Sequence, residues 1–268
     1  MRKGIRKFAA ITGSLALIGA SLAGCGKSEK TPATSDTGVS TPAESKDEQK
    51  TQMTSEEIIK AAAAEGKVGN WGLGNEYEIL ALLAKYGLPT SYLSQDFTMD
   101  GFDDDSITLA SAMTYNEYGL VINDYDGGYK YGDTVGTIDM NDEGVAMLED
   151  MIFCTKDFAK NNPETVKAFL YASLKGWADA CADPEEAAEI CFEAGSSVSA
   201  DHQKFMASEV KKLVSTDMKG NKVSELGNMD EEAMKQTLDI AKQYVKLDDS
   251  AAADKLANMT LDDIRDTL

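Results

Sequence analysis

Apolar residues recur at helix and strand spacings from Thr54 onward. Residues 54–67 (TSEEIIKAAAAEGK) predict a helix, in which Thr54 and Glu57 have the spacing of a capping box. The pattern then predicts strands at 67–71, 91–97, 107–114, 134–139 and 151–154. Between them it predicts a glycine turn at 72–75, a helix at 76–87, an acidic loop at 100–105 and a helix beginning near Asn116. Strands that alternate with helices favour an α/β fold with a mainly parallel sheet.

Beyond Thr155 the pattern is helical. Amphipathic helices are predicted at 163–182, 184–194, 200–214 and 229–245, two of them with proline near the start. In the first of these helices Phe169, Leu170, Leu174 and Trp177 share one face, which we interpret as helix core. The C-terminal third is therefore expected to differ from the α/β part before it.

The first 24 residues have the pattern of a bacterial lipoprotein signal peptide. Four cations in residues 1–7 precede the uncharged stretch 8–24 (FAAITGSLALIGASLAG), which is too short for a membrane span of about 20 apolar residues. The stretch ends in Leu-Ala-Gly before Cys25, as in a lipobox. An ordinary signal peptide with a chance cysteine is the alternative. We expect cleavage before Cys25, a lipid on its thiol, and a protein anchored on the extracytoplasmic face of the cell membrane.

Residues 25–52 are expected to form a disordered tether behind that anchor. They are rich in Ser, Thr, Lys and Glu and hold one Val and no aromatic residue, so they offer little to bury. Cys154, Cys181 and Cys191 follow in the folded part. A disulfide between Cys181 and Cys191 is compatible with their spacing, but small buried hydrophobes are the favoured interpretation. No cysteine or histidine spacing indicates a metal, and we expect neither a metal nor a cofactor.

Charge narrows the classes of ligand. The chain has 268 residues and a net charge of −20, and because residues 1–24 hold four cations and no acid, the remainder carries −24. A basic nucleic-acid-binding protein is excluded. Between Trp71 and Asp142 only Lys85 and Lys130 stand against thirteen acids, which suits a neutral or amine-bearing ligand. An acidic solvated face explains the same charge.

Reactive groups are scarce in this sequence. The lone histidine, His202, lies between two polar residues and is expected at the surface. The glycines of 69–74 (GNWGLG) match neither of the common phosphate-binding motifs. No combination of nucleophile and base emerges, and we expect a binding protein rather than an enzyme.

Two polar and aromatic clusters, at 71–77 and 113–117, follow predicted strands. The carboxyl ends of parallel strands are where α/β sheets place ligands. A planar heterocycle needs an aromatic face to stack on and a few amide or carboxylate groups to fix its edge. We therefore predict a ligand site composed of Trp71, Gly74, Asn75, Glu76, Tyr115, Asn116 and Glu117. The alternative is that Trp71 and Tyr115 pack the domain.

At these clusters the sequence resembles the thiamine pyrimidine synthase-like family of ABC-transporter solute-binding proteins. Residues 66–78 (GKVGNWGLGNEYE) resemble the first strand and glycine loop of the family's second lobe, and 112–117 (AMTYNE) a later ligand-side loop. The resemblance continues in order, from about Gly66 to Val245, through 138–150, 153–155, 162–164, 169–170, 173–177 and 183–187.

The resemblance implies a periplasmic-binding-protein-like fold of type II. Residues 66–142 correspond to a complete second lobe with a parallel sheet, and 143–268 to the crossover and the helical part of a truncated first lobe. Two lobes usually need on the order of 300 residues, whereas 216 remain after the signal peptide and tether. The N-terminal part of the first lobe is missing from this pattern, so the C-terminal helices are expected to lack part of the sheet that they cover in the family.

The resemblance also implies a function: a lipoprotein that binds a small heterocycle, such as a thiamine-precursor pyrimidine, and passes it to the permease subunits of an ABC importer. One alternative is a thiamine-pyrimidine synthase-like enzyme, which the scattered cysteines disfavour. Another is a truncated copy that no longer binds ligand.

Overall fold

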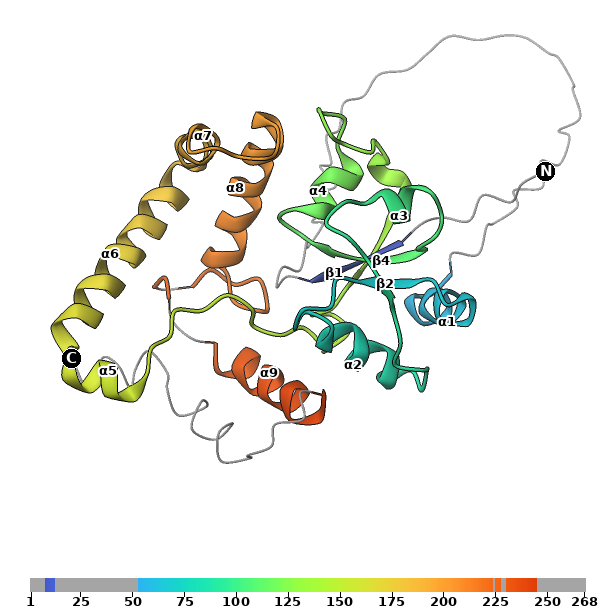
Figure 1. Cartoon of the computed structure of the whole chain (residues 1–268), viewed down its shortest axis with the longest axis horizontal. Coiled ribbons are helices and arrows are strands. Elements are labelled where there is room, and N and C mark those ends of the chain that lie inside the picture. The colour runs from blue at the N-terminus through green and yellow to red at the C-terminus, as the bar shows by residue number, and fades with distance from the viewer. Residues whose placement is uncertain (1–7, 13–52, 224, 228–229, 245–268) are drawn as a thin grey trace, which may run out of the picture.

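A parallel sheet forms the centre of the α/β part of the molecule (Figure 1). The computed structural model describes residues 8–12, 53–223, 225–227 and 230–244. The strand order is β3-β2-β4-β1-β5, and the paired strands run parallel. The strands are β1 (Phe8–Thr12), β2 (Val68–Asn70), β3 (Leu93–Ser94), β4 (Leu109–Met113) and β5 (Gly136–Asp139). The predicted α/β class is confirmed.

Helices cover both faces of this sheet. Ile59 of α1 (Ser55–Glu65), Leu82 of α2 (Tyr77–Lys85) and Ile240 of α9 (Glu231–Tyr244) belong to one core cluster together with Leu109 of β4. On the other face α3 (Asp100–Asp103) and α4 (Glu117–Ile122) pack against Ala110 and Ala112. Successive residues of β4 thus point to opposite cores, as the alternation of side chains along a strand requires.

The capping box predicted at the start of α1 is present. The Thr54 side chain accepts a hydrogen bond from the Glu57 backbone N–H at 3.3 Å, and the Glu57 carboxylate accepts one from the Thr54 N–H at 2.9 Å. Two backbone donors at the helix start are thereby satisfied. Gly66 ends the helix with a φ of 67°, a conformation that glycine adopts without strain.

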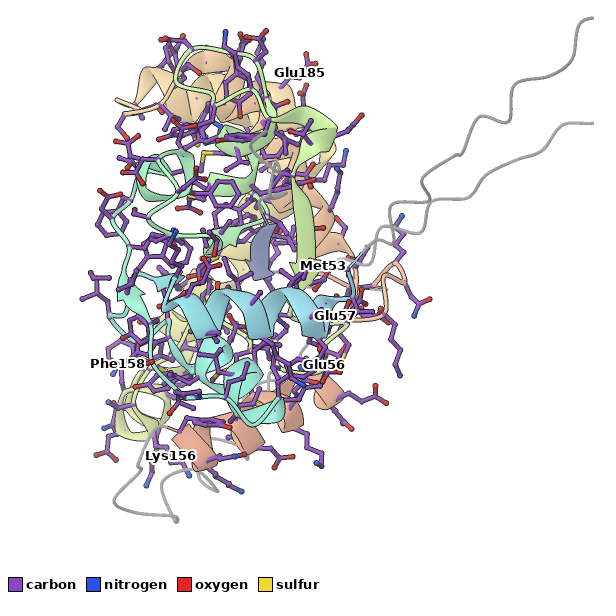
Figure 2. The ribbon with its side chains drawn as sticks, turned by 90° about the vertical axis from the view of Figure 1, so that its right-hand side faces the viewer. Met53, Glu56, Glu57, Lys156, Phe158 and Glu185 are labelled. Carbon is purple, nitrogen blue, oxygen red and sulfur yellow. The ribbon has the colours of Figure 1, made fainter. Side chains whose placement is uncertain are left out.

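The remaining helices form the C-terminal part. They are α5 (Lys156–Asn161), α6 (Pro163–Ala182), α7 (Pro184–Glu193) and α8 (Ala200–Ser215). Figure 1 shows α5, α6 and α7 apart from the sheet, with α8 lying between α7 and the sheet. Figure 2 labels Lys156 at the start of α5 and Glu185 at the start of α7 near opposite ends of the molecule, because α6 runs most of its length. Among the described residues, no helix combines the length and apolarity needed to cross a membrane.

Several predictions made from the pattern are wrong. The acidic loop at 100–105 contains the short helix α3, with Phe102 buried against Tyr131. Residues 151–154 form no strand, and Phe153 is 85% exposed. The pattern predicts no helix at 156–161, where the structure has α5, capped by the Thr155 hydroxyl.

The interpretation of the α6 apolar face as core is wrong at two positions. Phe169 is 61% exposed and Trp177 is 43% exposed. Cys154, Cys181 and Cys191 are free thiols, and none of them is buried, so neither the disulfide nor the interpretation as buried hydrophobes holds. Exposure of this kind is expected where helices lack the sheet that their apolar residues would cover.

Strand β1 lies within the segment predicted to be a signal peptide. Its backbone is inserted between β4 and β5, with Phe8 opposite Leu109 and Gly136, and Ile11 opposite Ala112 and Asp139. Strands β4 and β5 are therefore not neighbours of each other but flank a position one strand wide. The other residues of 1–24 and all of the tether 25–52 lie outside the described residues.

Candidate functional site

A pocket of about 380 Å³ opens at the carboxyl ends of β2, β4 and β5. Three segments line it: the loop after β2, the loop after β4 and the chain that follows β5. The lining residues are Leu73, Gly74, Asn75, Tyr77, Met113, Tyr115, Met147, Leu148, Glu149 and Asp150. A second hollow, between α7 and α8, measures about 90 Å³ and is too small for a heterocycle of drug-like size.

The loop after β2 is fixed by Asn70, which is 1% exposed. Its side-chain oxygen accepts a hydrogen bond from the Gly72 N–H at 2.7 Å, and its amide group donates to the Ser111 hydroxyl of β4 at 2.9 Å. Gly72 and Gly74 have φ values of 72° and 97°, which a non-glycine residue rarely adopts. The loop is thus built from backbone turns anchored on the neighbouring strand, and this geometry presents Asn75 to the pocket.

The loop after β4 is fixed by Glu117 and His202. The Glu117 carboxylate, 4% exposed, accepts hydrogen bonds from the Met113 N–H at 3.0 Å and from the Asn116 amide at 3.1 Å. His202 of α8 is fully buried; its Nε2 lies 2.8 Å from Asn116 Oδ1 and its Nδ1 lies 2.5 Å from the Tyr125 hydroxyl. The prediction of a surface histidine is wrong, because α8 packs this side chain against α4.

The segment after β5 is tied to α2 and α9. The Met147 N–H donates to Glu78 Oε1 at 2.5 Å, and the Leu148 N–H donates to the Thr237 hydroxyl at 2.7 Å. Asn75 then bridges two of the pocket walls, because its amide group donates to Glu149 Oε1 at 2.9 Å. The pocket is therefore held together by hydrogen bonds between the segments that line it.

A comparison with models of known protein families identifies the family of this chain. A family model described as NMT1/THI5 like matches residues 49–187, just over half of the chain, and these residues include the whole pocket. The chain belongs to the NMT1/THI5-like family. No curated protein and no solved structure matches the chain. The family includes ABC solute-binding proteins and thiamine synthase-like proteins. Membership of this family indicates that the chain binds a small-molecule ligand.

The pocket of this NMT1/THI5-like protein is acidic. No lysine or arginine is among its lining residues, whereas Glu149 and Asp150 are. Burial, followed by the charges of Glu149 and Asp150, raises the pKa of Tyr115 to about 12, so its hydroxyl stays protonated and can donate. Desolvation also raises the pKa of Glu149, although part of this side chain remains open to solvent. Such a pocket favours a ligand that carries a positive or hydrogen-donating group.

Three buried polar atoms in the two loops have no hydrogen-bond partner among the described residues. They are Trp71 Nε1, Asn75 Oδ1 and Thr114 Oγ1. A buried polar atom without a partner costs about 1–3 kcal/mol. Of these three residues only Asn75 lines the pocket, so a donor group of a ligand bound there could satisfy its Oδ1.

The predicted site residues divide into two groups. Gly74, Asn75 and Tyr115 line the pocket. Trp71, Glu76, Asn116 and Glu117 do not line it; Glu76 accepts a hydrogen bond from the Gly74 N–H at 2.8 Å, and Asn116 and Glu117 shape the second loop. The ligand-binding role of all seven residues stays a prediction.

Sequence reasoning missed the third wall, Met147 to Asp150. These residues come after the last strand of the sheet and have no glycine turn or aromatic residue to mark them. The acidic residues Glu149 and Asp150 can be read from the sequence. Their position beside Asn75 depends on the hydrogen bonds of Met147 and Leu148 to α2 and α9. Within the described part of the chain, no cluster of three or more potential metal ligands occurs.

Proposed function

We propose that this protein binds a small neutral or amine-bearing heterocycle, such as a thiamine-precursor pyrimidine, and delivers it to the permease of an ABC importer. The observation that carries the proposal is the pocket of about 380 Å³, in which Asn75 and Tyr115 from two strand-end loops lie beside carboxylates, in a chain of the NMT1/THI5-like family. An aromatic ring, an amide and carboxylates are the groups that a nitrogen heterocycle needs for stacking and edge recognition.

Attachment to the membrane belongs to the same proposal. Residues 1–24 would act as the signal peptide, Cys25 would carry the lipid, and residues 26–52 would tether the binding unit to the extracytoplasmic face. The fold would be a type II periplasmic-binding-protein-like one, with residues 66–142 as the second lobe.

Ligand binding is tested by a thermal-shift screen of the full chain and of the chain from Gly26 onward. The ligands are thiamine, its hydroxymethyl and formylamino pyrimidines, riboflavin and taurine. A bound ligand stabilises the folded state by RT ln(1 + [L]/Kd), so we expect a rise in Tm with at least one heterocycle and none with the sulfonate taurine. No shift with any heterocycle at millimolar concentration would contradict the proposal for these solutes.

The charge of the pocket is tested by Glu149→Gln. This substitution keeps the side-chain oxygen that accepts from Asn75 but removes the negative charge. Binding of a cationic ligand such as thiamine should weaken by roughly tenfold, about 1.4 kcal/mol, and binding of a neutral pyrimidine should change less. Equal losses for both ligands would show that the charge plays no part. Glu56→Gln, on the outer face of α1, is the matched control.

A second candidate is a copy that has lost ligand binding. It is favoured by one observation: every lining residue of the pocket lies between Leu73 and Asp150, so the helices α5 to α8 contribute no lining residue. A ligand held from one side keeps more of its surface in water than one enclosed by two lobes. The thermal-shift screen separates the two candidates.

We propose that the chain is not a synthase. Its free cysteines lie apart, at Cys154, Cys181 and Cys191, and its one histidine is engaged by Tyr125 and Asn116. The residues that line the pocket include no cysteine, serine, threonine, lysine or histidine. Mass spectrometry of the purified protein incubated with a small-molecule cell extract tests this statement, because the appearance of a new pyrimidine product would contradict it.

A further inference from the structure

The position of β1 between β4 and β5 has a consequence if residues 1–24 are removed. Neighbouring strands lie about 4.8 Å apart, so without β1 the two flanking strands would be separated by about 9.6 Å, too far to pair directly. Both would then present unpaired backbone N–H and C=O groups inside the fold. The processed protein, whose existence rests on the proposed function, therefore has an open strand position in the middle of its sheet.

The walls of this position define what can fill it. Leu109, Ala110, Ser111 and Ala112 of β4 are each 0% exposed, and the two faces of the sheet are covered by separate core clusters. A strand buried on both faces must be uncharged and largely apolar. In the structure the position is held by Phe-Ala-Ala-Ile-Thr, which meets this requirement.

The same molecule carries an apolar segment with strand propensity and no strand partner. Met151 and Ile152 are each 49% exposed and Phe153 is 85% exposed, in a run (Met-Ile-Phe-Cys) that forms neither helix nor strand. Ile and Phe are among the residues that favour strands. The run has four residues, the length of β5, and no charge.

Within one chain this segment is poorly placed to fill the position. It follows the pocket wall, which is hydrogen-bonded to Glu78 and Thr237, and then leads directly into α5. In Figure 1 this part of the chain leaves the sheet toward α5 and α6. Helix α5 follows directly after the segment and has to move with it in either case. Insertion in the same chain would also have to turn the segment back past its own pocket wall, and insertion into a second copy avoids that turn.

We propose that the processed protein forms a reciprocal dimer, in which residues 151–154 of each copy enter the strand position between β4 and β5 of the other. The arrangement is self-complementary, as a two-fold symmetric interface requires. In each copy the inserted segment pairs with the unpaired backbone groups of β4 and β5. The insertion also buries the exposed apolar residues of the segment in both copies. The full chain, in which β1 holds the position, stays monomeric.

The experiment compares three proteins at micromolar concentration: the full chain, the processed protein extracted from membranes, and the chain from Gly26 onward. Light scattering gives their masses, and hydrogen exchange reports on the amides of β4 and β5. We expect a monomer for the full chain and twice the chain mass for the other two, with protected β4 and β5 amides in all three.

The decisive variant is Phe153→Asp. Because this side chain is 85% exposed, the substitution leaves the monomer intact, but a carboxylate cannot enter a strand position buried on both faces. In the chain from Gly26 we expect loss of the dimer and of β4 and β5 protection. Phe169→Asp, at a 61% exposed position on α6, is the matched control and should leave the dimer unchanged.

The other outcomes overturn the inference. A monomer with protected β4 and β5 amides means that the position is filled within one chain. A monomer, aggregate or unfolded chain with unprotected amides means that no second copy fills it. The intact mass of the membrane-extracted protein separately tests the signal peptide: retention of residues 1–24 contradicts the lipoprotein proposal, while the chain from Gly26 still tests the strand position.

Discussion

Glu78 is a carboxyl group buried in the core behind the pocket. It is 3% exposed, its Oε1 accepts the Met147 N–H, and its Oε2 has no hydrogen-bond partner among the described residues. Burial, assisted by the charges of Glu149 and Asp139, raises the pKa of Glu78 to about 8. At neutral pH this side chain is therefore largely protonated in the folded protein and ionised in the unfolded one.

This difference predicts a pH dependence of stability. Between about pH 4.5 and pH 8 the folded state binds a proton that the unfolded state lacks, so the free energy of unfolding falls as pH rises, by up to about 1.4 kcal/mol per unit. Glu78→Gln removes the titration and should flatten that fall. Urea denaturation of both proteins at several pH values in this window measures it. Parallel pH curves for the two proteins would show that Glu78 ionises normally.

Tyr115 is the aromatic residue from the predicted site that lines the pocket. If its ring stacks on the ligand, Tyr115→Ala should weaken binding by roughly tenfold or more, which is about 1.4 kcal/mol, and leave the Tm of the unliganded protein nearly unchanged. Calorimetric titration gives the affinity. A large fall in Tm would indicate instead that Tyr115 serves packing. Tyr171→Ala, 72% exposed on α6, is the control that should alter neither quantity.

At the scale of elements, the junction of α4 and α8 fixes one wall of the pocket. Gly119 of α4 is buried, and a Cβ built there would overlap the ring of Phe205 of α8. His202 lies one turn earlier on α8. Its ring is nearly parallel to the Phe205 ring, with 6.1 Å between the ring centroids, and its Nε2 contacts Asn116. The absence of a side chain at Gly119 thus allows α8 to approach closely enough for its histidine to hold the second loop.

Two glycines, Gly119 at this junction and Gly176 on the exposed surface of α6, should respond in opposite directions to substitution by alanine. Gly119→Ala should destabilise the protein by about 1–3 kcal/mol, because the methyl group forces Phe205 and α8 away. Gly176→Ala, in the exposed middle of α6 with nothing near its Cβ position, should stabilise it by about 0.5–1 kcal/mol through helix propensity. Denaturant unfolding of both variants tests the pair. Stabilisation by both would mean that Phe205 moves aside without cost.

Elements whose signals are local could be predicted from the sequence, and elements that depend on distant contacts could not. The capping residues of α1 and the prolines that begin α6 and α7 define helix starts within a few residues. Residues 151–154 have a strand's composition, but a strand exists only where an edge is available. For the site, the two strand-end loops were anticipated, whereas burial of His202 depends on α8 packing against α4, 86 residues from Asn116.

At the scale of the whole molecule, burial is uneven. The sheet and its covering helices contain most of the buried apolar residues, among them Ile59, Leu82 and Leu109 at 0% exposure. Helix α6, by contrast, buries only Val166 among its 20 residues. A helix of that length with so little buried surface depends mainly on its own backbone hydrogen bonds.

This contrast predicts an order of local stability. Amide hydrogens of α6 should exchange through local opening, roughly tenfold or more faster than those of β4, which should require global unfolding. Native-state hydrogen exchange of the full chain at increasing low denaturant concentrations measures both. The free energy of exchange of the β4 amides should fall steeply with denaturant concentration, because their exposure requires loss of the core. That of the α6 amides should fall only slightly. Equal protection and equal slopes would mean that α6 and the sheet unfold as one unit, which would require its exposed Phe169 and Trp177 to be covered in solution.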